Sequence, residues 1–233
     1  MKDSFKNRLH TRGGINMKSV VIVGAGGFGR EVLEIFKDIN KQKKKWEILG
    51  FVDSNTELHG KTINNYPVLG GLNWFENHQD VASVCAVGEP EAKKKVVEAL
   101  HKMNVHFCNA IHPSVIMSEF IEFGEGVIIG AGTILTVNIK IGNHVIINLN
   151  CTIGHDAVIE DYCSLMPTVK INGNNHLYEG VYVGTGASFI HQISVGAWTT
   201  IGAGAVVVNN MPGNVLAVGV PAKVLKHLSN NKQ

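Results

Sequence analysis

The sequence lacks the features that mark several large classes of protein. Among its 233 residues, 21 lysines and arginines face 19 aspartates and glutamates, and the net charge of +2 is too small to indicate a nucleic-acid-binding surface. No apolar run reaches the roughly 18 residues of a membrane span, and no signal peptide is visible, so we expect a cytoplasmic protein without membrane insertion. The cysteines form no CxxC pair, and we therefore expect free thiols and no metal site. The cysteines are Cys85, Cys108, Cys151 and Cys163.

What the sequence does have is a six-residue period. From Ile111 to Val206 it divides into sixteen consecutive hexads without an insertion, and the first position of every hexad is apolar. With 45% hydrophobic residues overall, chance gives such a run on the order of once in 10⁵ sequences. The second position is often glycine, and the fifth is nearly always small or β-branched, with Asn175 as the clear exception. The first positions are Ile111, Met117, Phe123, Ile129, Leu135, Ile141, Ile147, Ile153, Ile159, Leu165, Ile171, Leu177, Val183, Phe189, Val195 and Ile201.

This period predicts a parallel β-helix, in which each hexad forms one flat face and three hexads close a triangular coil. First-position side chains then point inward and stack on their equivalents eighteen residues away, with coils about 4.8 Å apart. Glycine at the second position suits a tight corner, where a side chain would be hindered. Cys151 and Cys163 fall on inward fifth positions, which favours buried thiols. One interior ladder should consist of Ile129, Ile147, Leu165, Val183 and Ile201.

The chain before the hexads alternates between strand and helix patterns. Residues 1–16 are polar and without pattern, and we expect a disordered tail there. Residues 17–110 are expected to form a small Rossmann-like α/β domain with a parallel sheet, and residues 111–233 a β-helix domain with a C-terminal tail. Strands are expected at residues 19–24, 46–53, 81–88 and 105–110, and helices at residues 27–40 and 90–103.

The first candidate site is the segment GAGGFG at residues 24–29, which matches GxGxxG between a predicted strand and a predicted helix. Glycines let the backbone approach a phosphate, and the helix N-terminus favours its negative charge. Asp53 ends the next strand, where a carboxylate can accept a hydrogen bond from a ribose hydroxyl or a base. The segment fits a nicotinamide dinucleotide, a mononucleotide or nucleotide sugar, or a glycine turn without a ligand. About four strands make half of a full dinucleotide fold, which favours the smaller nucleotide ligands.

The second candidate site is the pair His155-Asp156, at outward positions of one hexad. An imidazole at a corner of the coil can act as a general base, with the carboxylate orienting it. One coil above lies Gly173, whose missing side chain would leave room for a ligand, and two coils above lies His191. A solvated surface histidine is the competing interpretation.

Together these features resemble the NeuD/PglD family of bacterial sugar acyltransferases, over about residues 17–228. The hexads, the glycine segment, the sequence FVD at residues 51–53 and the sequence GVPAK at residues 219–223 carry the resemblance. It implies a left-handed β-helix and a homotrimer with three active sites between neighbouring β-helices. It further implies that acetyl-CoA lies in the groove between two subunits, and that an amino sugar on a nucleoside diphosphate reaches in from the N-terminal domain.

The resemblance also implies roles for individual residues. Three departures from the family pattern stand out: Ser164 where a second histidine contacts the cofactor side, Phe28 where the glycine turn often has histidine, and no glycine after Pro167. The implied sets are catalytic His155, Asp156 and Asn148; cofactor-binding Ser164, Gly173, Thr185, Ala203 and Lys223; and substrate-binding Gly26, Gly27, Phe28, Gly29, Asp53, Ser54 and Gly88.

The activity implied in this way is acetyl transfer from acetyl-CoA to the amine of a 4-amino-4,6-dideoxy sugar linked to UDP or dTDP, for surface polysaccharide or glycan biosynthesis. His155 would assist removal of a proton, and backbone N–H groups would stabilise the oxyanion. The alternatives are O-acetylation of a sugar of the sialic acid type, a non-catalytic nucleotide-sugar-binding scaffold, and an NAD-dependent oxidoreductase.

Overall fold

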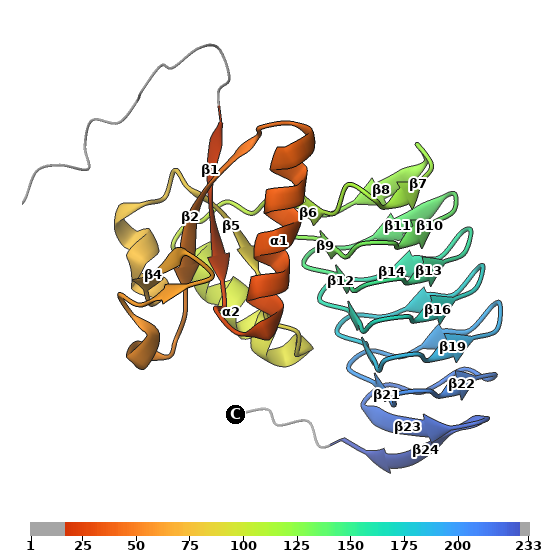
Figure 1. Cartoon of the computed structure of the whole chain (residues 1–233). Coiled ribbons are helices and arrows are strands. Elements are labelled where there is room, and N and C mark those ends of the chain that lie inside the picture. Colours follow the sequence, from red (N-terminus) through yellow and green to blue (C-terminus); the bar gives the residue numbers. More distant parts are fainter. Residues whose placement is uncertain (1–16, 229–233) are drawn as a thin grey trace, which may run out of the picture.

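The structure is a computed structural model that describes residues 17–228 (Figure 1). The tail expected at residues 1–16 lies outside the described residues. An α/β unit comes first and a stack of short strands follows it, in the order expected from the sequence. Among the described residues, no helix combines the length and the apolar character needed to cross a bilayer.

The α/β unit is built on a five-stranded sheet of order β3-β4-β2-β1-β5, parallel except for the antiparallel pair β3 and β4. The apolar run of β1, residues 20–23, is buried throughout, as expected for a strand covered on both faces. The elements are β1 (Lys18–Val23), α1 (Gly27–Gln42), β2 (Trp46–Val52), η1 (Thr56–Leu58), β3 (Thr62–Ile63), β4 (Tyr66–Gly70), η2 (Leu72–Asn77), β5 (Ala82–Cys85) and α2 (Pro90–Lys102).

Both helices form where the sequence predicts them. In α1, Val32 and Phe36 are fully buried on the helix face that packs against the sheet. In α2, Pro90 occupies the first turn, and the Glu89 carboxylate caps the helix by accepting hydrogen bonds from two backbone N–H groups.

Two parts of the sheet differ from the sequence prediction. The strand expected at residues 105–110 is reduced to one bridge between Ser83 and Phe107, and its last residue joins the β-helix instead. The β3–β4 hairpin is additional. Its turn places Asn64 and Asn65 at positive φ, which asparagine tolerates better than most residues.

The β-helix has three faces, numbered in the order in which the chain forms them, and each corner is named by the faces it joins. Strands pair with a register of eighteen residues along the stack, as in Ile128 with Ile146, except at its C-terminal end, where Thr200 pairs with Leu216. Face 1 consists of β6 (Ala110–Ile111), β9 (Ile128–Ile129), β12 (Ile146–Ile147), β15 (Ser164–Leu165), β18 (Tyr182–Val183), β21 (Thr200–Ile201), β23 (Val215–Gly219) and β24 (Ala222–His227); face 2 of β7 (Ile116–Met117), β10 (Ile134–Leu135), β13 (Thr152–Ile153), β16 (Lys170–Ile171), β19 (Ser188–Phe189) and β22 (Val206–Val207); and face 3 of β8 (Ile121–Phe123), β11 (Ile139–Ile141), β14 (Val158–Ile159), β17 (His176–Leu177) and β20 (Ser194–Val195).

The interior matches the hexad prediction. The five residues of the predicted ladder are all fully buried in one apolar cluster that runs through the prism. Asn175, the polar exception at a fifth position, is also buried, and its side chain bonds the backbone of Asn172, Ile190 and Ile193. A buried amide satisfied in this way avoids most of its desolvation cost.

The corners explain two further positions of the repeat. A Cβ at Gly154, in the second position, would lie 2.5 Å from the Gly173 nitrogen of the next coil, so the coils approach too closely there for a side chain. Every fourth position from Gly126 to Gly204 has a positive φ, including Asp156 at 57°. This left-handed residue turns the chain at each corner.

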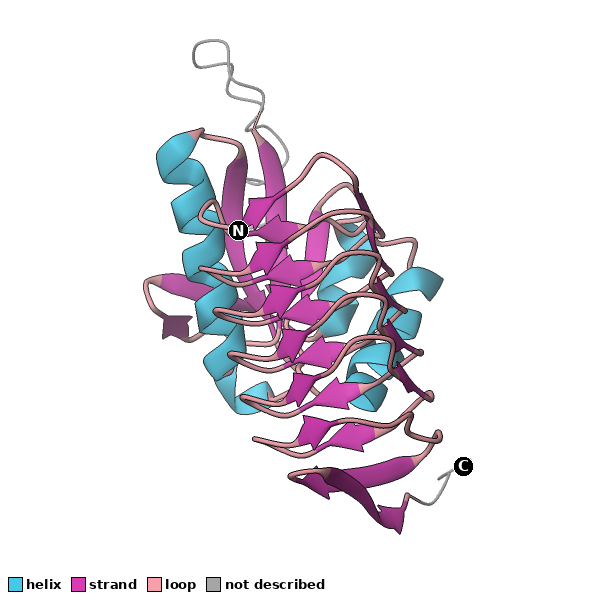
Figure 2. Ribbon diagram, turned by 90° about the vertical axis from the view of Figure 1, so that its right-hand side faces the viewer, coloured by secondary structure: helices cyan, strands magenta, loops and turns pink. Residues whose placement is uncertain are grey.

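The α/β unit packs against face 1 and corner 3/1 of the prism, and Figure 2 shows the stacked coils in front of the sheet and helices. Ile128 and Ile146 of face 1 belong to the same apolar cluster as Phe36 of α1. Corner 2/3 lies opposite face 1 and is therefore the part of the prism farthest from the α/β unit.

Candidate active site

His155 and Asp156 lie at corner 2/3, in the turn between β13 and β14. His155 Nδ1 lies 2.8 Å from Asp156 Oδ2, and both side chains are exposed. Asn138, one coil below, donates from Nδ2 to Asp156 Oδ1 at 3.3 Å. The hydrogen bond with His155, and then the one from Asn138, lowers the pKa of Asp156. The ionised carboxylate therefore holds the proton of His155 on Nδ1, and Nε2 is left to accept a proton.

The role expected of Gly173 is corrected by the position of the imidazole. A Cβ at Gly173 would lie 2.5 Å from both Cε1 and Nε2 of His155. The space left by the missing side chain is thus filled by the His155 ring itself and not by free volume for a ligand. Gly173 allows the ring to lie over the next coil, which fixes the direction in which the ring points.

Three of the other expected residues, one catalytic and two cofactor-binding, lie at a different corner. Asn148, Thr185 and Ala203 all follow strands of face 1 and are therefore at corner 1/2. Asn148 Oδ1 accepts from the Leu149 backbone at 2.7 Å, and among the described residues it forms no hydrogen bond with His155. Within one chain, the structure does not bring Asn148 to the imidazole that it was expected to support.

Ser164 is a correction to the expected cofactor set. Its side chain is fully buried under α2 and accepts a hydrogen bond from Lys93 Nζ at 2.8 Å. Lys93 also donates to the carbonyl of Cys163. Because the Ser164 hydroxyl is enclosed between the α/β unit and face 1, it is not available to a cofactor in the groove.

The glycine turn lies at the carboxyl ends of β1 and β2, where α/β sheets bind ligands. A Cβ at Gly29 would collide with the Gly24 carbonyl oxygen, so close packing of α1 on β1 requires glycine there. Asp53 accepts hydrogen bonds from the backbone of Ala25 at 2.7 Å and of Asn55 at 2.8 Å. The carboxylate expected to bind a ribose or a base therefore also fixes the shape of the glycine turn.

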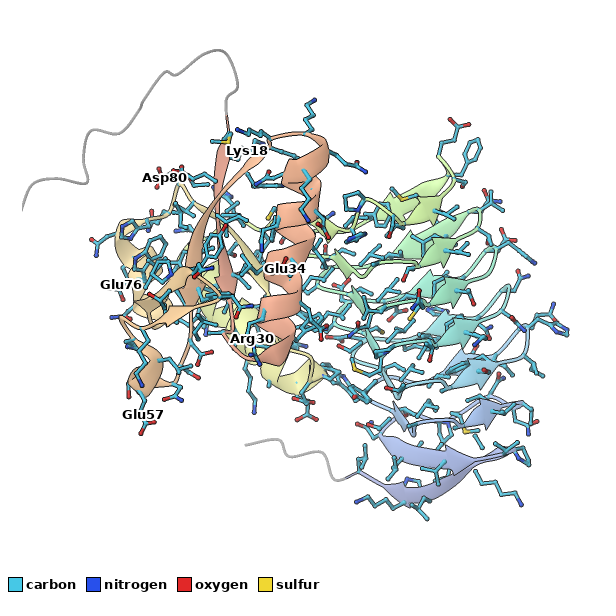
Figure 3. All side chains as sticks on the ribbon, viewed as in Figure 1. Lys18, Arg30, Glu34, Glu57, Glu76 and Asp80 are labelled. Carbon is cyan, nitrogen blue, oxygen red and sulfur yellow. The ribbon has the colours of Figure 1, made fainter. Side chains whose placement is uncertain are left out.

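The other residues of the expected nucleotide site surround this turn. Arg30 and Glu57 lie at the same end of the sheet, and Lys18 and Asp80 lie at the opposite end (Figure 3). Gly26 and Gly27 are exposed at the start of α1, Ser54 is exposed after Asp53, and Gly88 precedes α2. The structure thus brings the expected nucleotide residues together at one end of the α/β unit.

Known proteins resemble both the α/β unit and the β-helix of this chain. Residues 19–100 match the family model described as the PglD N-terminal domain. A GDP-perosamine N-acetyltransferase from Escherichia coli O157:H7 is 29% identical over 88% of this chain and 95% of its own length. The crystal structure of PerB from Caulobacter crescentus, in complex with CoA and GDP-perosamine, has a TM-score of 0.83 at 30% identity and covers 91% of this chain and 100% of that one.

The chain belongs to the NeuD/PglD family of hexapeptide-repeat sugar acyltransferases. Membership confirms the expected fold class, an α/β domain followed by a left-handed parallel β-helix, and the expected enzyme class, an acetyl-CoA-dependent acyltransferase. A serine acetyltransferase from Buchnera aphidicola is 33% identical over 56% of the chain, which spans only 43% of that protein.

Two residues that contact the expected site residues were missed at the level of sequence. Asn138 lies eighteen residues before Asp156, and the repeat register alone could have identified it as a neighbour. Lys93 is fully buried between α2 and face 1, and it lies seventy-one residues from its partner Ser164. No periodic pattern connects those two positions, so the sequence offered no indication of the contact.

Proposed function

We propose that this protein transfers an acetyl group from acetyl-CoA to the amino group of a nucleotide-linked 4-amino-4,6-dideoxy sugar. The observation that carries the proposal is the exposed His155–Asp156 pair on a coil of a chain that belongs to this family. The nucleotide expected from the sequence is UDP or dTDP. PerB was crystallised with a GDP-linked sugar, so GDP is a third candidate.

In this reaction the amine attacks the thioester carbonyl carbon, a C–N bond forms and the C–S bond breaks. His155 Nε2 accepts the proton that the amine loses, and the departing CoA sulfur takes up a proton. Asp156 keeps the ring in the tautomer with Nδ1 protonated and stabilises the imidazolium. Backbone N–H groups of the coils are suited to stabilising the oxyanion of the tetrahedral intermediate.

The proposed site requires more than one copy of the chain. His155 is at corner 2/3, whereas the glycine turn belongs to the unit packed on face 1, across the prism. A sugar held at the glycine turn of one chain therefore reaches the His155 of a neighbour. Ile116 of face 2 is 65% exposed and Ile134 is 38% exposed, and burial of such side chains favours association.

In a trimer, corner 2/3 of one chain would lie beside corner 1/2 of the next. That arrangement joins His155 and Gly173 to the exposed Thr185 and Ala203 of a neighbour, with Lys223 near the end of the groove. We therefore propose this groove as the acetyl-CoA site. A trimer of about 76 kDa, three times the 25.2 kDa chain, is the expected mass in light scattering, and a monomer at micromolar concentration contradicts the shared site.

The activity is tested by thiol release from acetyl-CoA with a panel of GDP-, UDP- and dTDP-linked amino sugars, and with a sialic acid type hydroxyl acceptor. Release with one amino sugar supports the proposal, and release only with the hydroxyl acceptor replaces it by O-acetylation. CoA binding without turnover of any acceptor indicates a scaffold. Tight NADH binding without nucleotide-sugar binding indicates an oxidoreductase.

A further inference from the structure

Corner 3/1 carries a cluster that the acetyl-transfer site does not use. His144 is in the turn between β11 and β12, Glu125 is in the corresponding turn one coil below, and His101 is in the last turn of α2. Among the described residues, these three form the only group of three or more histidine, cysteine, aspartate or glutamate side chains whose donor atoms all lie within 4.8 Å of one another. The cluster joins the α/β unit to the β-helix.

The buried member of the cluster has no hydrogen-bond partner. His144 is 1% exposed, and neither Nδ1 nor Nε2 forms a hydrogen bond among the described residues. A buried imidazole left unpaired in this way is costly, and native proteins rarely leave one without a partner. Its Nε2 faces Glu125 Oε1 across 4.0 Å, which is too long for a hydrogen bond.

The packing around His144 holds the ring in this orientation. The ring stacks on Tyr162 at 5.5 Å and meets Phe107 edge-on at 4.6 Å. A Cβ at Gly126, one coil below, would collide with His144 Nδ1, so glycine there leaves room for the ring. The imidazole is thus fixed by its neighbours with Nε2 directed at the carboxylate.

The same carboxylate oxygen faces both histidines. Glu125 Oε1 lies 3.6 Å from His101 Nε2 and 4.0 Å from His144 Nε2. Ligands bound to one tetrahedral ion at about 2.0–2.1 Å are about 3.4 Å apart. Since His101 and Glu125 are 46% and 47% exposed, small movements of these two side chains bring all three donor atoms to that separation.

We propose that His101, Glu125 and His144 form a binding site for a divalent first-row transition metal ion of the Zn²⁺ type, which clamps α2 to the first coils of the β-helix. Two imidazole nitrogens and one carboxylate oxygen suit such ions and do not suit Mg²⁺ or Ca²⁺. The exposed side of the cluster leaves a coordination position for water. The site differs from the expectation of a metal-free protein drawn from the sequence.

Burial, and then the charges of His101 and Lys93, lower the pKa of His144 to about 4. The imidazole is therefore neutral at pH 7, which is the form that binds metal ions. The α/β unit supplies one ligand and the β-helix supplies two, so metal binding stabilises the contact between them. The clamp lies at corner 3/1 and the proposed catalytic pair at corner 2/3, so the two proposals are independent.

The test is titration of the full-length, chelator-treated protein with Zn²⁺ in a calorimeter, and with Co²⁺ followed by visible absorption. We expect one ion per chain with a dissociation constant in the micromolar range or below. At a hundredfold excess over that constant, the melting temperature should rise by about 5 °C. Absence of binding at millimolar Zn²⁺ overturns the proposal.

His101→Ala and Glu125→Gln are the informative variants, because both side chains are exposed and their loss leaves the core intact. Each should weaken Zn²⁺ binding at least tenfold and remove the thermal shift. His106→Ala is the matched control, since His106 is an exposed histidine near the cluster but outside it, and it should bind like the wild type. If both cluster variants bind Zn²⁺ as the wild type does, the ion is bound elsewhere and the site is wrong.

Discussion

Two corners of the β-helix each carry a histidine in a turn between two strands, and the two imidazoles have opposite environments. His155 at corner 2/3 is exposed and bonded to the Asp156 carboxylate. His144 at corner 3/1 is buried under α2 and Phe107, without a hydrogen bond, and burial lowers its pKa to about 4. The repeat fixes the backbone at both corners. The α/β unit, which covers corner 3/1 and not corner 2/3, determines which chemistry each histidine can perform.

The side of the prism that the α/β unit covers packs against lysine side chains as well as apolar ones. Lys93 is fully buried and donates to Ser164 and to the Cys163 carbonyl. Lys94 pairs with Glu179 at 2.7 Å and lies 5.2 Å from the centre of the Trp198 ring. Corner 2/3, which carries His155, has no comparable cover. Variants at the two corners should therefore affect different properties, which the following predictions use.

The largest effect is expected from Leu165→Asp, because the turns at both corners are held in place by the same buried interior of the prism. Leu165 is fully buried within the aliphatic cluster of the prism. A carboxylate placed there has no partner, at a cost of several kcal/mol, so the variant should be insoluble or unfolded. Expression, solubility and circular dichroism measure this. A soluble variant with unchanged assembly would show that the side chain can leave the interior.

At corner 2/3, His155→Ala should lower kcat by about 10²–10⁴-fold, the usual contribution of general acid–base assistance. CoA affinity should stay within a few-fold, because the imidazole contributes to proton transfer and not to cofactor binding. The melting temperature should hardly change, since the side chain is 57% exposed. Steady-state kinetics and a thermal melt separate the two properties.

His191→Ala is the matched control for His155. It lies at the same corner but two coils away, about 10 Å, which is too far to share a proton. We expect a loss below about tenfold. If His191→Ala abolishes activity and His155→Ala does not, the assigned base is wrong. If both variants keep full activity, catalysis rests on positioning alone.

On the α/β side, Asp53→Ala should weaken nucleotide-sugar binding by about tenfold to a hundredfold, because it removes charge-assisted hydrogen bonds that shape the glycine turn. Acetyl-CoA binding should be unchanged. Calorimetry with each ligand measures both. Glu57→Ala, an exposed carboxylate at the same end of the sheet, is the control and should bind both ligands normally (Figure 3). If Asp53→Ala weakens the binding of the nucleotide sugar and of acetyl-CoA equally, the two ligands do not occupy separate sites.

The last prediction concerns Lys93, on the side of the prism that the α/β unit covers. Burial lowers the pKa of Lys93 to about 7, from 10.5 for a free lysine. At pH values between these two pKa values, Lys93 is less protonated in the folded protein than in the unfolded chain. Lys93 therefore makes the free energy of unfolding rise by up to about 1.4 kcal/mol per pH unit. Lys93→Met should remove this rise and leave kcat unchanged. Urea unfolding at pH values of about 7, 8 and 9 measures the slope.

Comparison of wild type with Lys93→Met is needed because other groups act in the opposite sense. Burial raises the pKa of Cys85 to about 11 and that of Cys163 to about 12. These thiols stay protonated in the folded protein while they ionise in the unfolded chain, so stability falls as pH rises above about 9. The difference between the two proteins largely isolates the lysine. Identical slopes would mean that Lys93 is not the group that titrates.

The parts that the sequence predicted correctly are those in which neighbours lie at a fixed spacing. The hexads fixed the eighteen-residue register and the ladder through Leu165, and the apolar spacing in α1 placed Phe36 against the sheet. The pair His155-Asp156 was found because its partners are adjacent in sequence.

Most of the parts that failed depend on contacts that no spacing encodes. The run at residues 105–110 has the composition of a strand, but the chain crosses to the prism after a single bridge at Phe107. Ser164 is covered by a lysine seventy-one residues away. Gly173 was expected to leave space for a ligand, and the neighbouring imidazole fills that space. In the first two cases the deciding partner belongs to another layer of the molecule, whereas Gly173 follows His155 by eighteen residues and the repeat register could have revealed that contact.

The hairpin of β23 and β24 has a consequence for how the molecule can grow. A parallel ladder of eighteen-residue coils can be continued by any chain that offers one more coil, so a bare end is a seed for fibres. Here β24 runs antiparallel to β23 and ends face 1, with Lys223 and Lys226 exposed along it. A reversed edge strand with exposed lysines does not continue the parallel ladder, which disfavours fibre growth from this end of face 1.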